Sequence, residues 1–211
     1  MHDKQRYKRL RLLIRKLNKE RKTQAQKTDI LCNDLIAAQR EFIKKLDIIS
    51  FTANFYESIV GTTDLNTLLH IAAKFIKNEI PDASVAFFLR QTESFELHLF
   101  ASDQPITLDK QQLENSFTPE VVENICKSNK TCTLDDMFAM GLQGNLTVLN
   151  KISAVTTPLS QAGLSLGFIL IYRSSENRLT AEELNNISAV MPGLSRAIQS
   201  CRLALHNTVQ G

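Results

Sequence analysis

Residues 152–173 read ISAVTTPLSQAGLSLGFILIYR, and this stretch decides the fold. Its two halves, Ile152–Leu159 and Leu166–Arg173, are mostly apolar, rich in β-branched residues and of strand length. Ser160–Gly163 lies between them and ends in a glycine, which is typical of a tight turn. The stretch therefore predicts two antiparallel strands joined as a hairpin.

A second pair of strands is predicted upstream. Val85–Arg90 is an almost unbroken apolar run, which is typical of a strand covered on both faces. In Phe95–Leu99 the apolar residues alternate with polar ones, as in a strand with one wetter face. Gln91–Ser94 between them is expected to form the hairpin loop. Together the two hairpins predict an antiparallel sheet.

Helices are predicted on both sides of these hairpins. Leu65–Ile76 has the apolar spacing of an amphipathic helix. Thr180 and Glu183 form a capping box that opens a helix running towards His206. The segment 102–150 is expected to be irregular, with short helices. This order predicts an α+β domain in which long helices cover one face of the sheet and the middle segment covers the other.

Residues 1–60 are predicted to be helical throughout. Apolar residues recur there in steps of three and four, and neither Pro nor Gly occurs before Gly61. Residues 18–29 hold no large apolar side chain, so the segment is either one long helix or two helices joined near Thr28. A stripe of this length needs a partner, and we expect a dimeric coiled coil. The predicted domains are therefore residues 1–60 and residues 61–211.

The net charge of +3 is divided unevenly along the chain. Residues 1–28 hold eleven Lys or Arg against Asp3 and Glu20, a net charge of +9, and residues 29–211 carry −6. Residues 4–27 could contact anionic lipid headgroups or nucleic-acid phosphates, or could form the solvated flank of a coiled coil.

Apolar composition and cysteine usage narrow the class further. A hydrophobic fraction of 43% is ordinary for a globular chain. The apolar runs are too short for a transmembrane segment, and the N-terminus lacks the apolar core of a signal peptide. Four cysteines without a close pair fit reduced thiols, so a cytoplasmic location is expected.

Residues 64–205 resemble a GAF domain, a small-molecule sensor module of signalling proteins. The resemblance is carried by six stretches: Asp64–Leu69, Ser84–Leu89, Val155–Leu159, Leu166–Ile171, Arg178–Leu184 and Arg196–Ile198. It implies a sheet of about six strands with helices on both faces and a ligand pocket under the variable middle segment. It also implies dimerisation through the N- and C-terminal helices.

Two sets of residues follow as candidates for binding and for pairing. Ligand-binding candidates are strand residues that share one parity, a polar residue in an apolar strand, and two acids of the middle segment: Phe88, Arg90, Phe100, Thr156, Asp135 and Asp136. Dimerisation candidates are the apolar stripe residues of the terminal helices: Leu10, Leu13, Leu17, Leu31, Leu35, Phe42, Leu46, Ile49, Ile187, Leu194, Ile198 and Leu205.

Catalytic motifs are sparse. Gly163–Gly167 matches the Gly-x-Ser-x-Gly nucleophile elbow, but an elbow needs a helix after the serine and a strand is predicted there. The four histidines show no metal-ligand spacing, so no metal or cofactor is identified. Glycine-rich phosphate loops are missing from the sequence, which excludes the common nucleotide-driven classes.

Cysteine chemistry supplies the enzyme alternative. Cys126 and Cys132 lie near Lys127 and Lys130, which could lower a thiol pKa. Some GAF-like proteins are thiol-based methionine sulfoxide reductases. Neither cysteine has the neighbouring histidine of bilin-binding members, and Asn177–Glu183 departs from the cyclic-nucleotide signature in three residue types.

The sequence thus predicts a non-enzymatic sensory or regulatory module. A small molecule bound between the sheet and the middle segment would shift the pairing of the terminal helices and act on an output domain or a separate partner. One alternative is a dimerisation scaffold whose pocket is filled by side chains. The other is the thiol enzyme.

Overall fold

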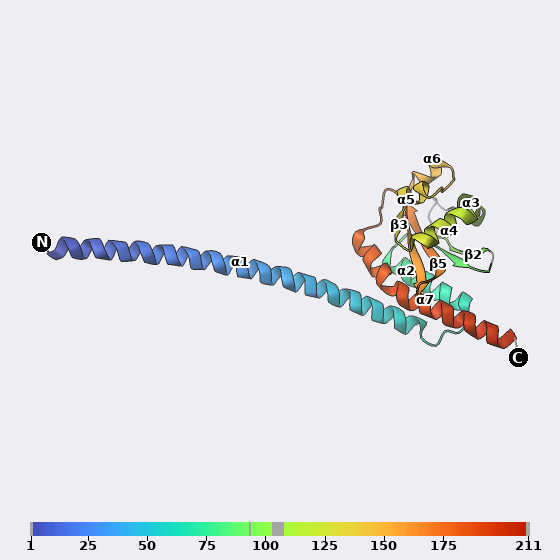
Figure 1. The fold of residues 1–211 in the computed structure, drawn as a ribbon, viewed down its shortest axis with the longest axis horizontal. Coiled ribbons are helices and arrows are strands. Elements are labelled where there is room, and N and C mark those ends of the chain that lie inside the picture. The colour runs from blue at the N-terminus through green and yellow to red at the C-terminus, as the bar shows by residue number, and fades with distance from the viewer. Residues whose placement is uncertain (1, 93, 103–107, 210–211) are drawn as a thin grey trace. The chain divides into compact units, whose positions relative to one another are not determined.

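The computed structural model describes residues 2–92, 94–102 and 108–209. The chain divides into two compact units, Met1–Ile49 and Ser50–Gly211. The described residues of the first unit all belong to helix α1 (His2–Ile59), and the second unit holds the last turns of α1 and every other element (Figure 1). The predicted α+β class with a long N-terminal helix is confirmed.

Helix α1 is one continuous helix, not two. Its polar stretch stays helical because the threonine hydroxyls bond within the helix: Thr23 Oγ1 donates to the Lys19 carbonyl and Thr28 Oγ1 to the Gln24 carbonyl, both at 3.0 Å. Thr28 is therefore not the N-cap of a second helix.

Five strands form one sheet in the described part of the chain, in the order β2–β1–β5–β4–β3, and every neighbouring pair is antiparallel. The strands are β1 (Ser84–Arg90), β2 (Phe95–Phe100), β3 (Cys132–Thr133), β4 (Ile152–Gln161) and β5 (Leu164–Ser174). All four predicted strands are confirmed. The short β3 was not predicted, and the described residues form five strands where the resemblance implies about six.

The β4–β5 hairpin is tighter than predicted. Ser160 and Gln161, expected in the turn, belong to β4, and Gln161 pairs with Leu164. Only Ala162 (φ 48°) and Gly163 (φ 82°) remain as the connection. Two residues with positive φ make the turn that matches the twist of a hairpin.

Strand β3 pairs with β4 only at Thr156 and Val155. Pro158 stands two residues beyond this pairing, and proline has no N–H to donate to a further strand. The ladder on this side of β4 is therefore short.

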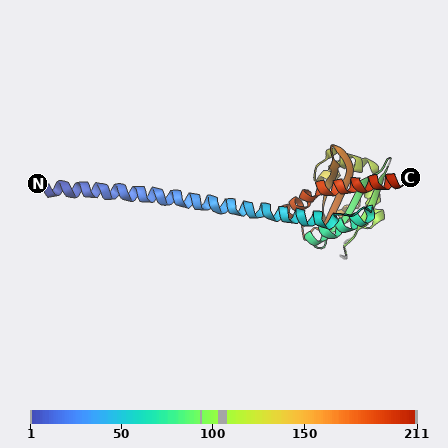
Figure 2. The ribbon, with the colours of Figure 1, turned by 90° about the horizontal axis from the view of Figure 1, so that it is seen from below.

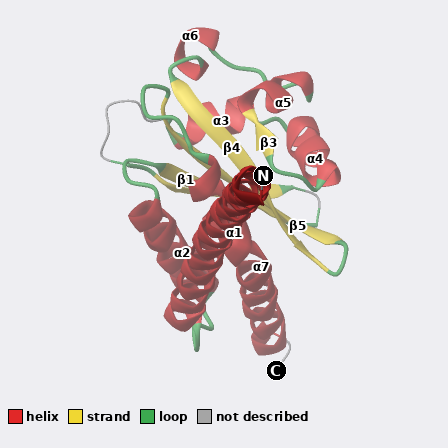
Figure 3. Cartoon of the chain, turned by 90° about the vertical axis from the view of Figure 1, so that its left-hand side faces the viewer, coloured by secondary structure: helices red, strands yellow, loops and turns green. Residues whose placement is uncertain are grey.

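Helices lie on both faces of the sheet (Figure 3). One face is covered by α2 (Leu65–Glu79), α7 (Ala181–Val209) and the last turns of α1, with Phe55, Leu68 and Leu194 fully buried between them. The other face is covered by α3 (Lys110–Ser116), α4 (Pro119–Ser128), α5 (Leu134–Ala139) and α6 (Leu146–Leu149). This is the predicted arrangement.

The last turns of α1 fold with the second unit because Phe55 and Ile59 are part of its core. They run beside α7 (Figure 2). The sequence placed the start of this domain at residue 61.

Candidate functional site

The predicted ligand pocket is filled by the chain's own side chains in the described residues. Phe88 and Phe168 stack with ring centroids 4.7 Å apart, and Phe117 packs on both at 5.0 and 6.1 Å. The Tyr172 hydroxyl, buried on the same face, donates to the Leu108 carbonyl at 3.1 Å. The space between the sheet and the middle segment is therefore an aromatic core.

A hollow of about 280 Å³ remains at the rim of this face. It lies between α3 and the segment that leads into α6, and Gln112, Asn115, Ser116 and Gln143 contribute polar groups to it. None of the predicted ligand-binding residues lines it.

Phe88, Arg90 and Phe100 do not form one site. Phe88 is buried under the middle segment, whereas Arg90 is exposed at the end of β1 and pairs with Glu123 at 3.6 Å. Phe100 lies on the opposite face of the sheet, where its ring contacts Phe87 at a centroid distance of 5.8 Å. The prediction of a shared face was wrong because of the strand register. Phe100 pairs with Val85, and paired residues lie on the same face, so Phe100 lies on the face of Val85 and Phe87 and not on that of Phe88.

The two predicted acids lie in the first turn of α5, where Asp136 completes a capping box with Thr133. Asp136 accepts from the Thr133 amide at 2.8 Å and from the Thr133 hydroxyl at 2.7 Å, and these bonds lower the pKa of its carboxyl. Asp135 is exposed beside it. Thr156 is fully buried opposite Cys132, and its hydroxyl has no hydrogen-bond partner among the described residues.

Both cysteines of the predicted pair are buried. Burial raises the pKa of the Cys126 thiol above its ordinary value, contrary to the lowering expected from the nearby lysines. Cys132 is also buried, and its thiol donates to the Lys130 carbonyl at 3.4 Å. Lys127 points its ammonium towards Glu123 at 3.7 Å.

The Gly-x-Ser-x-Gly motif is part of a hairpin, as predicted. Ser165 and Gly167 lie inside β5, so a strand follows the serine where an elbow requires a helix. No group of three or more His, Cys, Asp or Glu among the described residues could hold a metal ion. No helix in the described ranges is long and apolar enough to cross a membrane.

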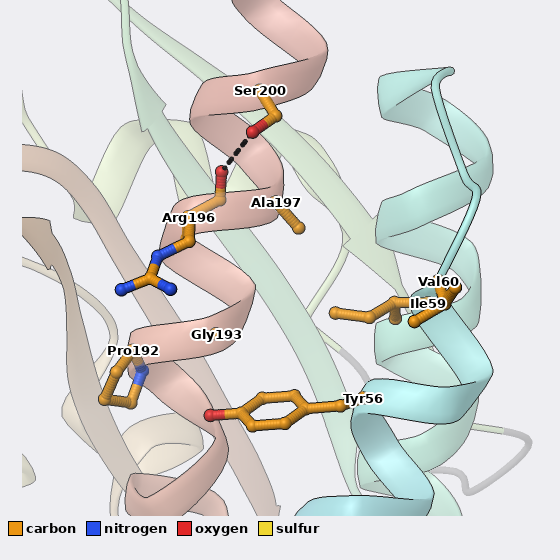
Figure 4. A pocket seen from close by; sticks show the side chains of 8 residues that line it. All are labelled: Tyr56, Ile59, Val60, Pro192, Gly193, Arg196, Ala197 and Ser200. Atoms are coloured by element: carbon orange, nitrogen blue, oxygen red, sulfur yellow. Dashed lines mark hydrogen bonds between the residues drawn. The ribbon is translucent and has the colours of Figure 1, made fainter.

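A groove of about 370 Å³ runs between the last turns of α1 and α7 (Figure 4). Tyr56 and Ile59 line it from α1, Val60 from the residue after α1, and Pro192, Gly193 and Ala197 from α7. The Tyr56 ring lies over Gly193, where an added Cβ would stand 1.9 Å from Tyr56 Cε1. The sequence reasoning missed this groove, although a glycine beside Pro192 inside a helix is a signal for close helix contact.

A second cavity, of about 250 Å³, lies where α7 packs on β4. Thr157 and Ser195 line it, are 3% and 1% exposed, and have no side-chain hydrogen-bond partner among the described residues. Lys130 contributes the charge in its lining. Pro192 also lines it and cannot donate to the Ser188 carbonyl, which leaves that acceptor without its helical bond.

The predicted pairing residues separate into two groups. Those of α1 are between 47% and 68% exposed: Leu10, Leu13, Leu17, Leu31, Leu35, Phe42, Leu46 and Ile49. Ile187, Leu194 and Ile198 of α7 are completely buried in the core of their own chain. They therefore cannot face a partner, and their inclusion was wrong. The side chain of Leu205 lies outside the described part of the structure.

Comparison with known proteins places the fold. No family model matches the sequence, and no curated protein does. Solved structures match at low identity. The GAF domain from a phosphoenolpyruvate-protein phosphotransferase of Coxiella burnetii superposes with a TM-score of 0.56 at 12% identity, covering 75% of this chain and 96% of that one.

Two further similar structures come from an enzyme and from a chemotaxis protein. A free methionine-R-sulfoxide reductase from Neisseria meningitidis has a TM-score of 0.54 at 16% identity, covering 74% of this chain and 91% of that one. Residues 122 to 287 of a methyl-accepting chemotaxis protein have a TM-score of 0.53 at 19% identity, covering 71% and 97%. At such identities the likeness is one of fold. The second unit thus has a GAF-like fold.

Proposed function

We propose that this chain, with its GAF-like second unit, is a sensory or regulatory signalling module that works as a homodimer paired through helix α1. The observation that carries the proposal is the α1 stripe, defined as Leu31, Leu35, Ala38, Phe42, Leu46, Ile49, Ala53, Tyr56 and Val60. Its large apolar members are exposed, from Tyr56 at 36% to Val60 at 79%. A contiguous exposed stripe of this kind favours a partner helix.

The last turns of α1 show that the stripe is distinct from the face that the domain buries. Phe55 and Ile59 belong to the core, and Ile59 also lines the open groove beside α7 together with Tyr56 and Val60. Packing within the chain therefore leaves Tyr56 and Val60 36% and 79% exposed. A second copy of the same helix supplies a matching apolar face.

The filled inner face of the sheet supports signalling through protein contacts. Phe88, Phe117 and Phe168 occupy the space where the resemblance implies a ligand. The pair would then act by holding two copies of an output domain, or a separate partner protein, at a fixed spacing. The chemotaxis context of one similar structure fits such a role.

Charge substitution on α1 tests the pairing. Phe42→Glu places an acid on the stripe, and Ile43→Glu places the same acid about 100° around the helix, outside it. Both side chains are similarly exposed, at 61% and 57%. We expect light scattering to show that Phe42→Glu weakens the dimer at least tenfold while Ile43→Glu changes it little.

The unaltered protein is the reference for this experiment. A monomer at micromolar concentration would contradict the proposal, as would equal effects of the two substitutions. Helical content measured by circular dichroism controls for loss of the helix itself.

Small-molecule sensing is a second candidate, favoured by the cavity between α7 and β4. Two buried hydroxyls without partners, Thr157 and Ser195, face a space that Lys130 makes electropositive. Because unpaired buried hydroxyls are costly, a small hydroxylated anion there would satisfy them. Such a ligand would contact the segment around Pro192, which also lines the groove beside α1.

Native mass spectrometry of the purified chain tests this candidate. We expect a bound small mass that is lost in the Thr157→Val, Ser195→Ala double variant and kept in Ser200→Ala, which alters an exposed serine of α7. Absence of any bound mass, with no change in melting temperature on adding citrate or inorganic phosphate, would contradict it.

We further propose that the module is not an enzyme. The raised pKa of Cys126 makes its thiol a weak nucleophile at neutral pH. Reduction of free methionine sulfoxide by the purified chain, abolished in Cys126→Ser, would overturn this.

A further inference from the structure

The N-terminal part of α1 has two chemically different sides. Its apolar residues Tyr7, Leu10, Leu13, Ile14 and Leu17 fall within an arc of about 120°, taking about 100° per residue. The large ones are 52% to 75% exposed. Lysines and arginines occupy most of the remaining circumference, Arg6 near the N-terminal end lies within the arc, and no acid occurs from Lys4 to Lys19.

This arc differs from the α1 stripe further along the helix. The members of the stripe from Leu31 to Val60 stay within about 80°, which is the narrow seam of a paired helix. The N-terminal arc is wider by half, and residues 18–29 separate it from the stripe by about three turns without a large apolar side chain. Leu10, Leu13 and Leu17 are in phase with the seam, and Tyr7 and Ile14 widen the apolar face beyond it, so this segment carries a broader apolar surface than a paired helix needs.

Charge also opposes pairing of this segment with its own copy. Residues 1–28 carry +9, so a parallel pair would bring two such charges side by side. A partner must therefore be anionic and must also accept large apolar side chains. A bilayer surface with acidic headgroups meets both conditions, because leucines enter the acyl boundary while lysine and arginine stems extend to the phosphates.

We propose that residues 4–22 are an interfacial helix that binds the surface of anionic membranes through the Leu10–Leu13–Leu17 face. Nucleic acid would satisfy the basic residues, but it gives the exposed leucines and Ile14 nothing to contact. On a membrane the apolar side contacts the acyl boundary and the basic side contacts the phosphates, so both sides of the helix have a partner. Membrane contact would bring the GAF-like unit to a lipid surface.

The neighbouring leucines provide a matched test. Leu12 and Leu13 are 59% and 64% exposed, but Leu12 lies among the basic residues, about 100° around the helix. The full chain is sedimented with phosphatidylcholine vesicles and with vesicles of about one third phosphatidylserine. We expect at least tenfold tighter binding to the anionic vesicles, with a further tenfold or greater loss in the Leu13→Gln, Leu17→Gln variant.

The control variant Leu12→Gln is expected to bind within twofold of the unaltered chain. Glutamine keeps helix propensity close to that of leucine, so circular dichroism should show equal helical content in all variants. Equal binding to neutral and anionic vesicles, no vesicle binding, or equal losses in the two variants would each overturn the proposal. So would binding to duplex DNA that survives Leu13→Gln, Leu17→Gln while vesicle binding is absent.

Light scattering on the same samples separates this inference from the proposed dimer. Leu13 and Leu17 are among the predicted pairing residues but lie outside the α1 stripe (Leu31 to Val60) that carries the proposed dimer. Dimerisation can therefore fail while vesicle binding persists, and the reverse.

Discussion

Gly167 is the residue at which the sheet tolerates no side chain. Its φ is 133°, and a Cβ built there would stand 1.8 Å from the carbonyl oxygen of Phe88 in the neighbouring strand. Both sides of Gly167 are paired, to Leu89 and to Leu159. The close approach of β1 to β5 at this point depends on glycine.

Gly167→Ala is therefore expected to lower the free energy of unfolding by about 3 kcal/mol, because strain and backbone displacement add. Gly163→Ala is the matched control in the same hairpin, since its φ is also positive but nothing lies within 4 Å of the added Cβ. We expect a loss of about 1 kcal/mol there. Urea unfolding monitored by circular dichroism measures both, and equal losses would contradict the explanation.

Single residues also show where sequence reasoning reaches its limit. The hairpin, the capping box at Thr180 and the hairpin identity of the Gly-x-Ser-x-Gly motif depend on neighbours in sequence, and the sequence predicted them. Whether Phe88 and Phe100 lie on the same face depends on the register of two strands, which neighbouring residues in the sequence do not reveal. The filling of the pocket depends on contacts between Phe88, Phe117 and Phe168, which are far apart in the chain.

Among the elements, β5 and α7 are joined by a buried ion pair. Arg173 Nη1 and Nη2 donate to Glu183 Oε1 and Oε2 at 2.9 and 2.8 Å, and Nη2 also donates to the Arg178 carbonyl at 2.6 Å. The guanidinium side chain is only 4% exposed. The capping role of Glu183 was predictable from Thr180. Its ion pair with Arg173 was not, because Arg173 lies on β5 and the contact depends on how β5 and α7 pack.

Acid should weaken the ion pair between Arg173 and Glu183. Burial alone would raise the pKa of Glu183, but hydrogen bonds from Thr180 and Arg173 outweigh it and hold the pKa below the ordinary 4.5. A lowered folded-state pKa gives stability that is complete above 4.5 and is lost as the pH falls through the lowered value. The contribution of Glu183 is therefore present at neutral pH and disappears in acid.

Glu183→Gln leaves a buried guanidinium without its charge partner, and we expect it to lose about 3 kcal/mol at pH 7. The difference from the unaltered chain should shrink as the pH falls below 4.5. Glu182→Gln, in the exposed neighbouring position, should cost less than about 0.5 kcal/mol at either pH. Chemical unfolding across this pH range measures both, and a constant deficit for Glu183→Gln would contradict the assignment.

For the whole molecule, the uneven charge makes the proposed pairing sensitive to salt. In a parallel dimer the two segments of +9 lie at the same end and repel, whereas in an antiparallel dimer they lie at opposite ends. Raising the salt from about 50 mM to about 300 mM screens exposed charges strongly. A parallel dimer should therefore tighten about threefold or more, measured by analytical ultracentrifugation.

An antiparallel dimer should show no such tightening, so the same titration assigns the direction of pairing. Binding to anionic vesicles should respond with the opposite sign and weaken as salt rises, because there the charges attract. A parallel dimer that loosens in salt would contradict this account of the charge distribution.

The last turns of α1 carry two apolar faces on the same short length of backbone. Phe55 and Ile59 are fixed in the core, and Tyr56 rests on Gly193 at the edge of the open groove. Because Tyr56 packs on Gly193, we expect an event that shifts α7 against the sheet to alter this contact, and a partner that binds Tyr56 to affect the position of α7. If the two are coupled, linkage requires the coupling free energy to be the same in both directions. The state of α7 would then change the affinity of a partner bound along these turns by the same factor by which the partner shifts α7.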